Sequence, residues 1–339
     1  MTTDRDTGPI PIVGPLPAPP PPRPVTELPT ADLPTADLPV AEPATAEPAT
    51  PGPAHEVPDG GGAHVSPGKP PGRAGRNLVA AIGVGLGLGA VILTSLLVYR
   101  PAFLLVLTAA VLVGVVELTR ALAAGGVRAP LVPVLVGALA MTALAWTRGP
   151  SGLVVGLLLT VLAVLLWRLG DGPEGYLRDT SAGVLVALYV PLLAGFAVLL
   201  LVPDDGAARV LAFIATVVGN DVGGYAAGVL FGRHPMAPSV SPKKSWEGMA
   251  GSVVACVLVA TPIVVLALDG PWWGGVLFGI ALAASATIGD LGESLVKRDL
   301  GIKDMGQLLP GHGGIMDRLD SLLPSAAVAY LLLSWVAPA

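Results

Sequence analysis

The feature that most constrains this chain is a series of apolar runs that begins at Leu78 and continues almost to the C-terminus. Each run is close to the roughly 20 residues that a helix needs to cross the hydrocarbon core of a bilayer. Because backbone groups in lipid must be hydrogen-bonded within the segment, the runs are expected to be helical. We place about nine transmembrane helices, at 78–98, 102–121, 130–147, 151–167, 183–202, 208–230, 249–268, 272–291 and 321–337. The third and fourth are short, so a single broken or re-entrant hairpin is the alternative for them.

Composition favours an all-α polytopic membrane protein. Charged residues make up 13% of the chain and hydrophobic residues 53%, whereas a soluble domain averages about 25% charged residues. The single cysteine, Cys256, excludes an intrachain disulfide and a cysteine-based zinc site. Two of the four histidines lie before residue 78, so a histidine-rich metal cluster is not expected either. Any bound metal should therefore be held by carboxylates.

The segment 1–77 differs from the rest because it holds 20 of the 35 prolines. Such a segment buries too little apolar surface to offset the entropy lost on ordering. We therefore expect a disordered Pro/Ala-rich cytoplasmic tail, which serves either as a spacer or as a docking segment for other proteins.

The lysines and arginines predict the orientation of the helices. With the N-terminus in the cytoplasm, the tail and alternate loops hold 16 of the 19 basic residues, and the opposite loops hold only Arg100, Arg148 and Arg209. Cytoplasmic loops of membrane proteins carry an excess of this kind. A multi-pass protein of the cell membrane, with a cytoplasmic N-terminus, is the resulting prediction.

Three polar segments stand out, the first around Asp221 within the predicted helix 208–230 and the second in the loop that follows this helix. A carboxylate within a membrane helix is costly, so Asp221 should face the bundle interior and have a partner. In the loop, Lys243 and Lys244 with neighbouring hydroxyls could supply charges and donors to a polyphosphate. Ordinary cytoplasmic loop lysines are the competing interpretation.

The densest polar segment is 289–320. If the preceding helix continues past residue 289, Asp290, Glu293 and Lys297 lie on one of its faces. Asp317 and Asp320 repeat the same spacing at the start of the last helix, and a solvated salt-bridged loop is the competing interpretation. Paired carboxylates of this kind hold hard cations such as Mg²⁺, which bind substrate phosphates.

A histidine and two glycines, His312, Gly313 and Gly314, come directly before the last helix. Exposed backbone N–H groups at the start of a helix favour the binding of phosphate. We therefore expect a phosphate cradle beside the carboxylates.

The segments 294–298, 303–304 and 309–320 resemble the signature of the phosphatidate cytidylyltransferase (CDP-diacylglycerol synthase) family. The segment 241–248, the pair at 220–221 and Glu117 resemble other recurrent positions of that family. The sequence departs from the family after Asp221, where Val222 replaces a common threonine and its hydroxyl. The resemblance is strongest after residue 219 and implies two regions, N-terminal transmembrane helices at 78–182 and a C-terminal catalytic transmembrane region at 183–339.

The resemblance implies transfer of CMP from CTP to phosphatidic acid, which gives CDP-diacylglycerol and pyrophosphate, with Mg²⁺ as cofactor. Asp290 and Asp317 are the implied metal ligands, with Glu293 and Asp320 as supports; a second, monovalent cation is left open. The further catalytic candidates are Asp221, Lys297 and Arg298. The substrate-binding candidates are Ser241, Lys243, Lys244, Ser245, Glu247, His312, Gly313, Gly314 and Arg318. The expected partners are CTP, phosphatidic acid and the bilayer, without nucleic acid, and such folds commonly form homodimers.

Two other functions remain open. A CTP-dependent polyprenol or lipid kinase would use a similar site but would release CDP. A membrane transporter would also bury carboxylates, but its charges should cluster near the bilayer midplane. A CDP-alcohol phosphotransferase is disfavoured because its Asp-x-x-Asp-Gly-x-x-Ala-Arg segment is missing.

Overall fold

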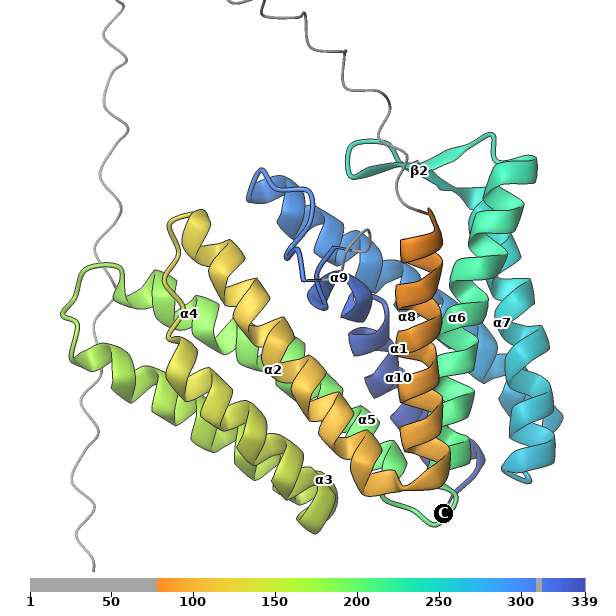
Figure 1. Cartoon of the computed structure of the whole chain (residues 1–339), viewed down its shortest axis with the longest axis horizontal. Helices are drawn as coiled ribbons and strands as arrows, with labels where there is room; N and C mark the ends of the chain where they lie inside the picture. The colour runs from red at the N-terminus through yellow and green to blue at the C-terminus, as the bar shows by residue number, and fades with distance from the viewer. Residues whose placement is uncertain (1–77, 309–312, 339) are drawn as a thin grey trace, which may run out of the picture. The chain divides into compact units, whose positions relative to one another are not determined.

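The described part of the chain is a bundle of long apolar helices (Figure 1). The structure, a computed structural model, describes residues 78–308 and 313–338, which all belong to one compact unit. Its elements in chain order are α1 (Leu78–Val98), α2 (Arg100–Ala124), α3 (Leu131–Leu169), α4 (Tyr176–Ala187), the π-helical turn η1 (Leu188–Leu192), α5 (Leu193–Leu201), α6 (Gly206–Phe231), β1 (Pro235–Ala237), β2 (Ser241–Ser245), α7 (Trp246–Ala267), α8 (Trp272–Asp299), α9 (Met316–Leu319) and α10 (Leu322–Val336). The tail at 1–77 and His312 lie outside the described residues.

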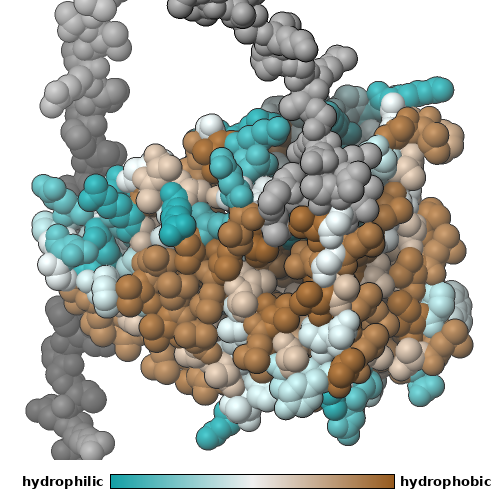
Figure 2. Space-filling model, in the orientation of Figure 1, coloured by the Kyte–Doolittle hydropathy of each residue, from teal (hydrophilic) through white to brown (hydrophobic). Residues whose placement is uncertain are grey.

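The prediction of an all-α multi-pass membrane protein is confirmed. Seven helices in the described ranges are long and apolar enough to cross a membrane. Figure 2 shows hydrophobic residues across the middle of the visible face and hydrophilic ones at its ends. Large apolar side chains stay exposed along the helices, such as Leu258 at 69% and Leu266 at 81%. Exposure of this extent marks a surface made for lipid rather than water.

The count of nine helices is not confirmed, and the difference arises at α1 and α3. The helix predicted at 78–98 forms as α1 (Leu78–Val98), of which the apolar part Gly83–Val98 is not counted among the seven. The predicted spans at 130–147 and 151–167 form the single element α3. The two runs are counted there as one helix, although the backbone between them leaves the helical conformation at Gly149.

α3 nevertheless folds back on itself at Gly149. This residue has φ 64° and ψ −148°, a conformation that glycine adopts far more easily than other residues, and Pro150 follows it. A Cβ added at Gly156 would lie 2.9 Å from Cγ of Met141, so the two arms of α3 pack closely against each other. The broken hairpin, left open by the sequence, is the arrangement that the structure has.

A two-stranded antiparallel hairpin replaces the loop expected after α6. β1 pairs with β2 with Pro235 opposite Ser245, and α7 begins directly after β2. We call the end of the bundle that carries this hairpin, the end of α8 and α9 the hairpin end (Figure 1). Most polar candidate residues lie there.

The opposite end of the bundle is tied together by Arg209, which is only 4% exposed. Its guanidinium pairs with Asp205 at 2.7 Å and donates to the carbonyl of Ala337, also at 2.7 Å. The hydrogen bond from Arg209 holds the pKa of the Asp205 carboxyl below its usual range. These contacts attach the last residues of α10 to the start of α6.

Candidate active site

Helix α8 carries the carboxylates predicted from the sequence. Its apolar half is buried in the bundle, where Phe278, Leu282 and Ala286 have no exposed surface. The helix runs on to Asp299, which meets the condition under which Asp290, Glu293 and Lys297 share one helical face. The packed half therefore fixes the direction in which the polar half presents Asp290 and Glu293.

A polar pocket of about 300 Å³ opens at the hairpin end between α6, α7, α8 and the hairpin. Its lining contains five candidates from the sequence analysis, namely Asp221, Lys243, Lys244, Ser245 and Asp290. Asn220, Ser252 and Thr287 line it as well. Thr287 precedes Asp290 by three residues, a helical spacing that could have indicated its position.

Glycines allow α6 and α7 to approach closely beneath this pocket. A Cβ at Gly224 would lie 2.5 Å from Oγ of Ser252, and one at Gly251 would lie 2.7 Å from the carbonyl oxygen of Gly223. The Ser252 hydroxyl donates to the Asn220 carbonyl at 2.7 Å across the same contact. Gly223 and Gly224 therefore allow α6 and α7 to pack closely, and the contact places Asp221 at the pocket.

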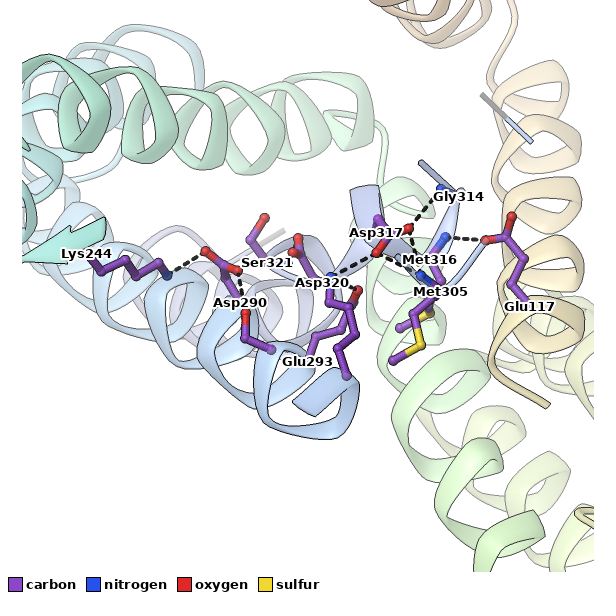
Figure 3. Close-up of polar contacts among 12 residues, drawn as sticks. Glu117, Lys244, Asp290, Glu293, Met305, Gly314, Met316, Asp317, Asp320 and Ser321 are labelled. Carbon is purple, nitrogen blue, oxygen red and sulfur yellow. Dashed lines mark hydrogen bonds and ion pairs between the residues drawn. The ribbon is translucent and has the colours of Figure 1, made fainter. Parts of the chain in front are cut away.

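Lys244 and Asp290 face each other in the pocket (Figure 3). The ammonium of Lys244 lies 2.5 Å from a carboxylate oxygen of Asp290 and 3.5 Å from the Thr287 carbonyl. Both side chains remain partly exposed, Lys244 at 25% and Asp290 at 38%. A ligand entering the pocket from water can therefore reach both charges.

A second, buried charge cluster lies deeper, between α8 and α9. The ammonium of Lys297 bridges Glu293 at 2.9 Å and Asp317 at 2.8 Å. The side chains of Glu293 and Asp317 are only 0% and 5% exposed. The ammonium of Lys297 is therefore shared by two buried acids, one from α8 and one from α9.

Asp317 also organises the loop that leads into α9. Its carboxylate accepts hydrogen bonds from the backbone N–H of Gly314 at 2.8 Å and of Met305 at 3.1 Å. Gly313 has φ 79°, and a Cβ there would lie 2.9 Å from the Asp317 carboxylate. Gly313 and Gly314, which were expected to bind a phosphate, thus lie against the carboxylate of Asp317.

Glu117 of α2 holds this loop from the other side (Figure 3). Its carboxylate is buried and accepts from the N–H of Met316, the first residue of α9, at 2.8 Å. A Cβ at Gly314 would lie 2.5 Å from that carboxylate, so only glycine leaves room for it. The resemblance in sequence had marked Glu117 without giving it a role, and the structure shows that it positions the loop.

We expect Glu117→Ala to loosen the loop before α9. The N–H of Met316 would be buried without an acceptor, which costs on the order of 1–3 kcal/mol. Faster hydrogen exchange in the peptide 313–319 and a lower melting temperature in detergent are the expected results. Glu117→Gln keeps an acceptor, so its exchange rate and melting temperature should be closer to those of the wild type. Glu174→Ala, at an exposed residue, should change neither quantity. Unchanged exchange in Glu117→Ala would contradict this role.

Four further candidates have structural contacts at the hairpin. Ser245 caps α7, since its Oγ accepts from the N–H of Gly248 at 3.1 Å. Glu247 accepts from the backbone N–H groups of residues 233 and 234, at 3.1 and 3.2 Å. Arg298 donates to the Val240 carbonyl at 3.4 Å, and Ser241 is the first residue of β2. Their contact with a substrate stays a prediction.

The acidic side chains expected to hold Mg²⁺ are Asp290, Glu293, Asp317 and Asp320. In Figure 3, Asp320 lies between Asp290 and Asp317, which point away from each other toward their own partners. No three acidic, histidine or cysteine side chains in the described ranges already form a metal site. The donors are nevertheless all oxygens, as Mg²⁺ prefers, and Oε2 of buried Glu293 has no hydrogen-bond partner among the described residues, while its Oε1 faces only the Lys297 ammonium. The donor atoms therefore fit a hard cation. In the structure, Asp290 forms an ion pair with Lys244, and Asp317 forms one with Lys297.

The chain is similar to known proteins over most of its length. The model of the cytidylyltransferase family matches residues 79–336. A phosphatidate cytidylyltransferase of Mycobacterium leprae is 48% identical over 280 residues, which cover 77% of this chain and 89% of that protein. One of Mycobacterium bovis is 44% identical over 287 residues, with 80% and 94% covered, and one of Helicobacter pylori is 38% identical over 159 residues, with 46% and 59% covered.

Proposed function

The chain belongs to the cytidylyltransferase family and is a nucleotidyltransferase, and from this premise we propose that it transfers CMP from CTP to phosphatidic acid. The products would be CDP-diacylglycerol and pyrophosphate. Relatives at 44–48% identity are phosphatidate cytidylyltransferases, and the match covers most of their length. The expectation from the sequence signature agrees with this family.

The observation that carries the proposal is the pairing of a water-accessible polar pocket with a buried acidic cluster at one end of an apolar bundle. The pocket lies beside Asp290, and the cluster contains Asp317. A nucleotide can approach from water while a lipid approaches from the bilayer. Both reactants carry phosphate, so the protein must chiefly position them and balance their charge.

The transfer needs no base from the protein. A phosphate oxygen of phosphatidate, already ionised at neutral pH, attacks the α-phosphorus of CTP and forms the new P–O bond. The bond between the α- and β-phosphates breaks, and pyrophosphate leaves with the electron pair. Lys243, Lys244 and Arg318 would bind the triphosphate, and Lys297 and Arg298 would stabilise the lipid phosphate or the leaving group.

Mg²⁺ is the cofactor that we propose for this site. Asp290 and Asp317 would hold it, with Glu293 and Asp320 in support. When bound, the ion would neutralise charge on the phosphates. Asp221 would contribute a further acceptor or pair with one of the cations, and a second, monovalent cation could share the site.

The orientation belongs to the same proposal. We place the hairpin end in the cytoplasm, together with the N-terminus, and the protein in the cell membrane. The basic residues support this, because 11 lie on that side after residue 77, as against Arg100, Arg148 and Arg209 on the other. CTP is made in the cytoplasm and would reach the pocket without crossing the bilayer.

An assay with purified protein in detergent tests the proposed function. CTP, phosphatidic acid and Mg²⁺ should yield CDP-diacylglycerol and an equal amount of pyrophosphate. EDTA should stop the reaction, and an excess of Mg²⁺ should restore it. Release of CDP with a phosphorylated polyprenol would support a lipid kinase instead, and solute uptake by vesicles without CTP would support a transporter.

Lys244→Met is expected to weaken CTP binding. The variant loses the ammonium that lies beside Asp290 in the pocket and leaves that carboxylate to repel the triphosphate. A charge-assisted hydrogen bond is worth roughly 1.5–3 kcal/mol, so the KM for CTP should rise about ten- to hundredfold. The KM for phosphatidic acid should change little. Arg120→Met, which removes an exposed charge at the same end, should leave both values unchanged; equal effects of the two variants would refute a specific role for Lys244.

A further inference from the structure

The helix formed by α4 and α5 is widened at η1, where five residues take the π-helical conformation. Pro191 lies within this turn and explains it. Proline has no backbone N–H, and in an α-helix its ring would clash with the carbonyl four residues earlier. Turns of this kind occur mostly as single insertions in α-helices and frequently lie at functional sites. The side chains that η1 presents to the bundle are therefore candidates for a role in the site.

Tyr189 is the polar side chain of η1. Its ring packs against the apolar cluster that includes Met316 and Leu319 of α9, and η1 contacts α2, α3 and α10. The hydroxyl is buried and has no hydrogen-bond partner among the described residues. A buried hydroxyl without a partner lowers stability, and a phenylalanine would fill the same space without that loss. A polar group near the hydroxyl would account for the tyrosine.

The acidic side chains of the candidate active site lie within electrostatic reach of this hydroxyl. The charges that act on it are those of Glu293, Asp320 and Asp290, and that of Glu293 acts most strongly. The side chain of Glu293 has no exposed surface, and its Oε2 also lacks a hydrogen-bond partner within 78–308 and 313–338. A buried donor and a buried acceptor without partners thus lie in the same region between η1 and α8.

We propose that the Tyr189 hydroxyl donates to Glu293 through one buried water and so fixes the orientation of this carboxylate at the proposed Mg²⁺ site. The inference rests on the proposed function and adds a positioning residue to its site. Lys297 holds Oε1 of Glu293 at 2.9 Å, and a donor at Oε2 would fix the second oxygen. Buried waters commonly bridge polar groups that have no other partner.

Tyr189→Phe tests this role, because it removes one oxygen atom and keeps the ring. The melting temperature of the purified protein without substrates is followed as Mg²⁺ is added. The half-saturating concentration of Mg²⁺ should rise about tenfold, as is typical when a residue that orients a metal ligand is lost. The Mg²⁺ constant for CDP-diacylglycerol formation should rise by the same factor, while kcat at saturating Mg²⁺ changes little. A role in packing alone would change neither Mg²⁺ constant.

Tyr330→Phe is the matched control. It makes the same chemical change in α10, where the ring of Tyr330 lies 5.7 Å from that of Phe196 and lines a pocket beside Arg209, at the other end of the bundle. This variant should keep both Mg²⁺ constants of the wild type. Mg²⁺ constants in Tyr189→Phe that equal those of the wild type would overturn the inference.

A double-mutant cycle with Glu293→Met tests the contact itself, without any reaction. Alone, Tyr189→Phe should lower the melting temperature by about 2–4 °C, because Oε2 of Glu293 loses its donor. In the Glu293→Met background the hydroxyl has no acceptor, so Tyr189→Phe should leave the melting temperature unchanged or raise it. Lys297 keeps Asp317 as its partner in that background.

Equal effects of Tyr189→Phe in the two backgrounds would overturn the inference. If Glu293→Met does not fold, the Mg²⁺ constants of Tyr189→Phe decide alone. A wild-type protein that forms no CDP-lipid would instead refute the proposed function, and the cycle would still report on the contact between Tyr189 and Glu293.

Discussion

Asp317→Asn is expected to lower turnover of CTP and phosphatidate by about a thousandfold or more. The carboxylate of Asp317 accepts from Lys297, from the N–H of Met305 and from that of Gly314. Asparagine would turn an NH₂ group toward one of these donors and would remove a charge at the proposed Mg²⁺ site. The rate of CDP-diacylglycerol formation at saturating substrates and Mg²⁺ is the measurement.

The control for this variant is Asp299→Asn, an exposed aspartate at the end of α8. It makes the same chemical change at the hairpin end and should keep wild-type turnover. Asp290→Asn should be nearly as inactive as Asp317→Asn, since it removes the other proposed metal ligand and leaves Lys244 without its carboxylate. All three proteins should elute from size exclusion as wild type does. Near-normal turnover in Asp317→Asn or Asp290→Asn would refute the metal assignment.

Lys297→Met is expected to remove activity and to destabilise the protein at the same time. The ammonium is the bridge between Glu293 and Asp317, both of which are almost fully buried. Loss of one partner from a buried ion pair costs about 3–5 kcal/mol, because the remaining charge is left uncompensated. The melting temperature in detergent and the rate of liponucleotide formation should both fall.

A second substitution separates the two effects. In the double variant Lys297→Met with Glu293→Gln, only Asp317 stays charged, and it keeps its two backbone donors. The melting temperature should recover largely, whereas activity should not. Lys303→Met, at an exposed lysine of the same end, is the control and should leave both unchanged. Recovery of activity in the double variant would show that Lys297 acts only in folding.

Much of the fold could be predicted because membrane helices follow from local sequence. Apolar runs of the right length locate them, and the extension of α8 to Asp299 follows from the periodic placement of its polar residues. The hairpin could not be predicted in this way. Its strands of three and five residues are too short to show an alternating pattern, and β2 begins with Ser241, a proline and two lysines.

In the candidate site, too, contacts within one helix could be predicted, whereas contacts between distant segments could not. Spacing within one helix placed Glu293 and Lys297 on a common face, and they form an ion pair. The pairing of Lys244 with Asp290 and of Glu117 with the N–H of Met316 joins segments 46 and 199 residues apart. No local pattern encodes such distances, because they depend on how the helices pack. Resemblance to a family marked these residues but did not give their partners.

The most direct test of the central claim is the fate of each phosphate of CTP. Purified protein is given phosphatidic acid, Mg²⁺ and CTP that is radiolabelled in either the α- or the γ-phosphate, and the lipid is then extracted. We expect the α-label in the lipid fraction and the γ-label in pyrophosphate, with both transfers lost in Asp290→Asn and Asp317→Asn. Recovery of the γ-label in lipid would contradict the transfer of CMP, and undiminished transfer by those two variants would contradict the role of Asp290 and Asp317.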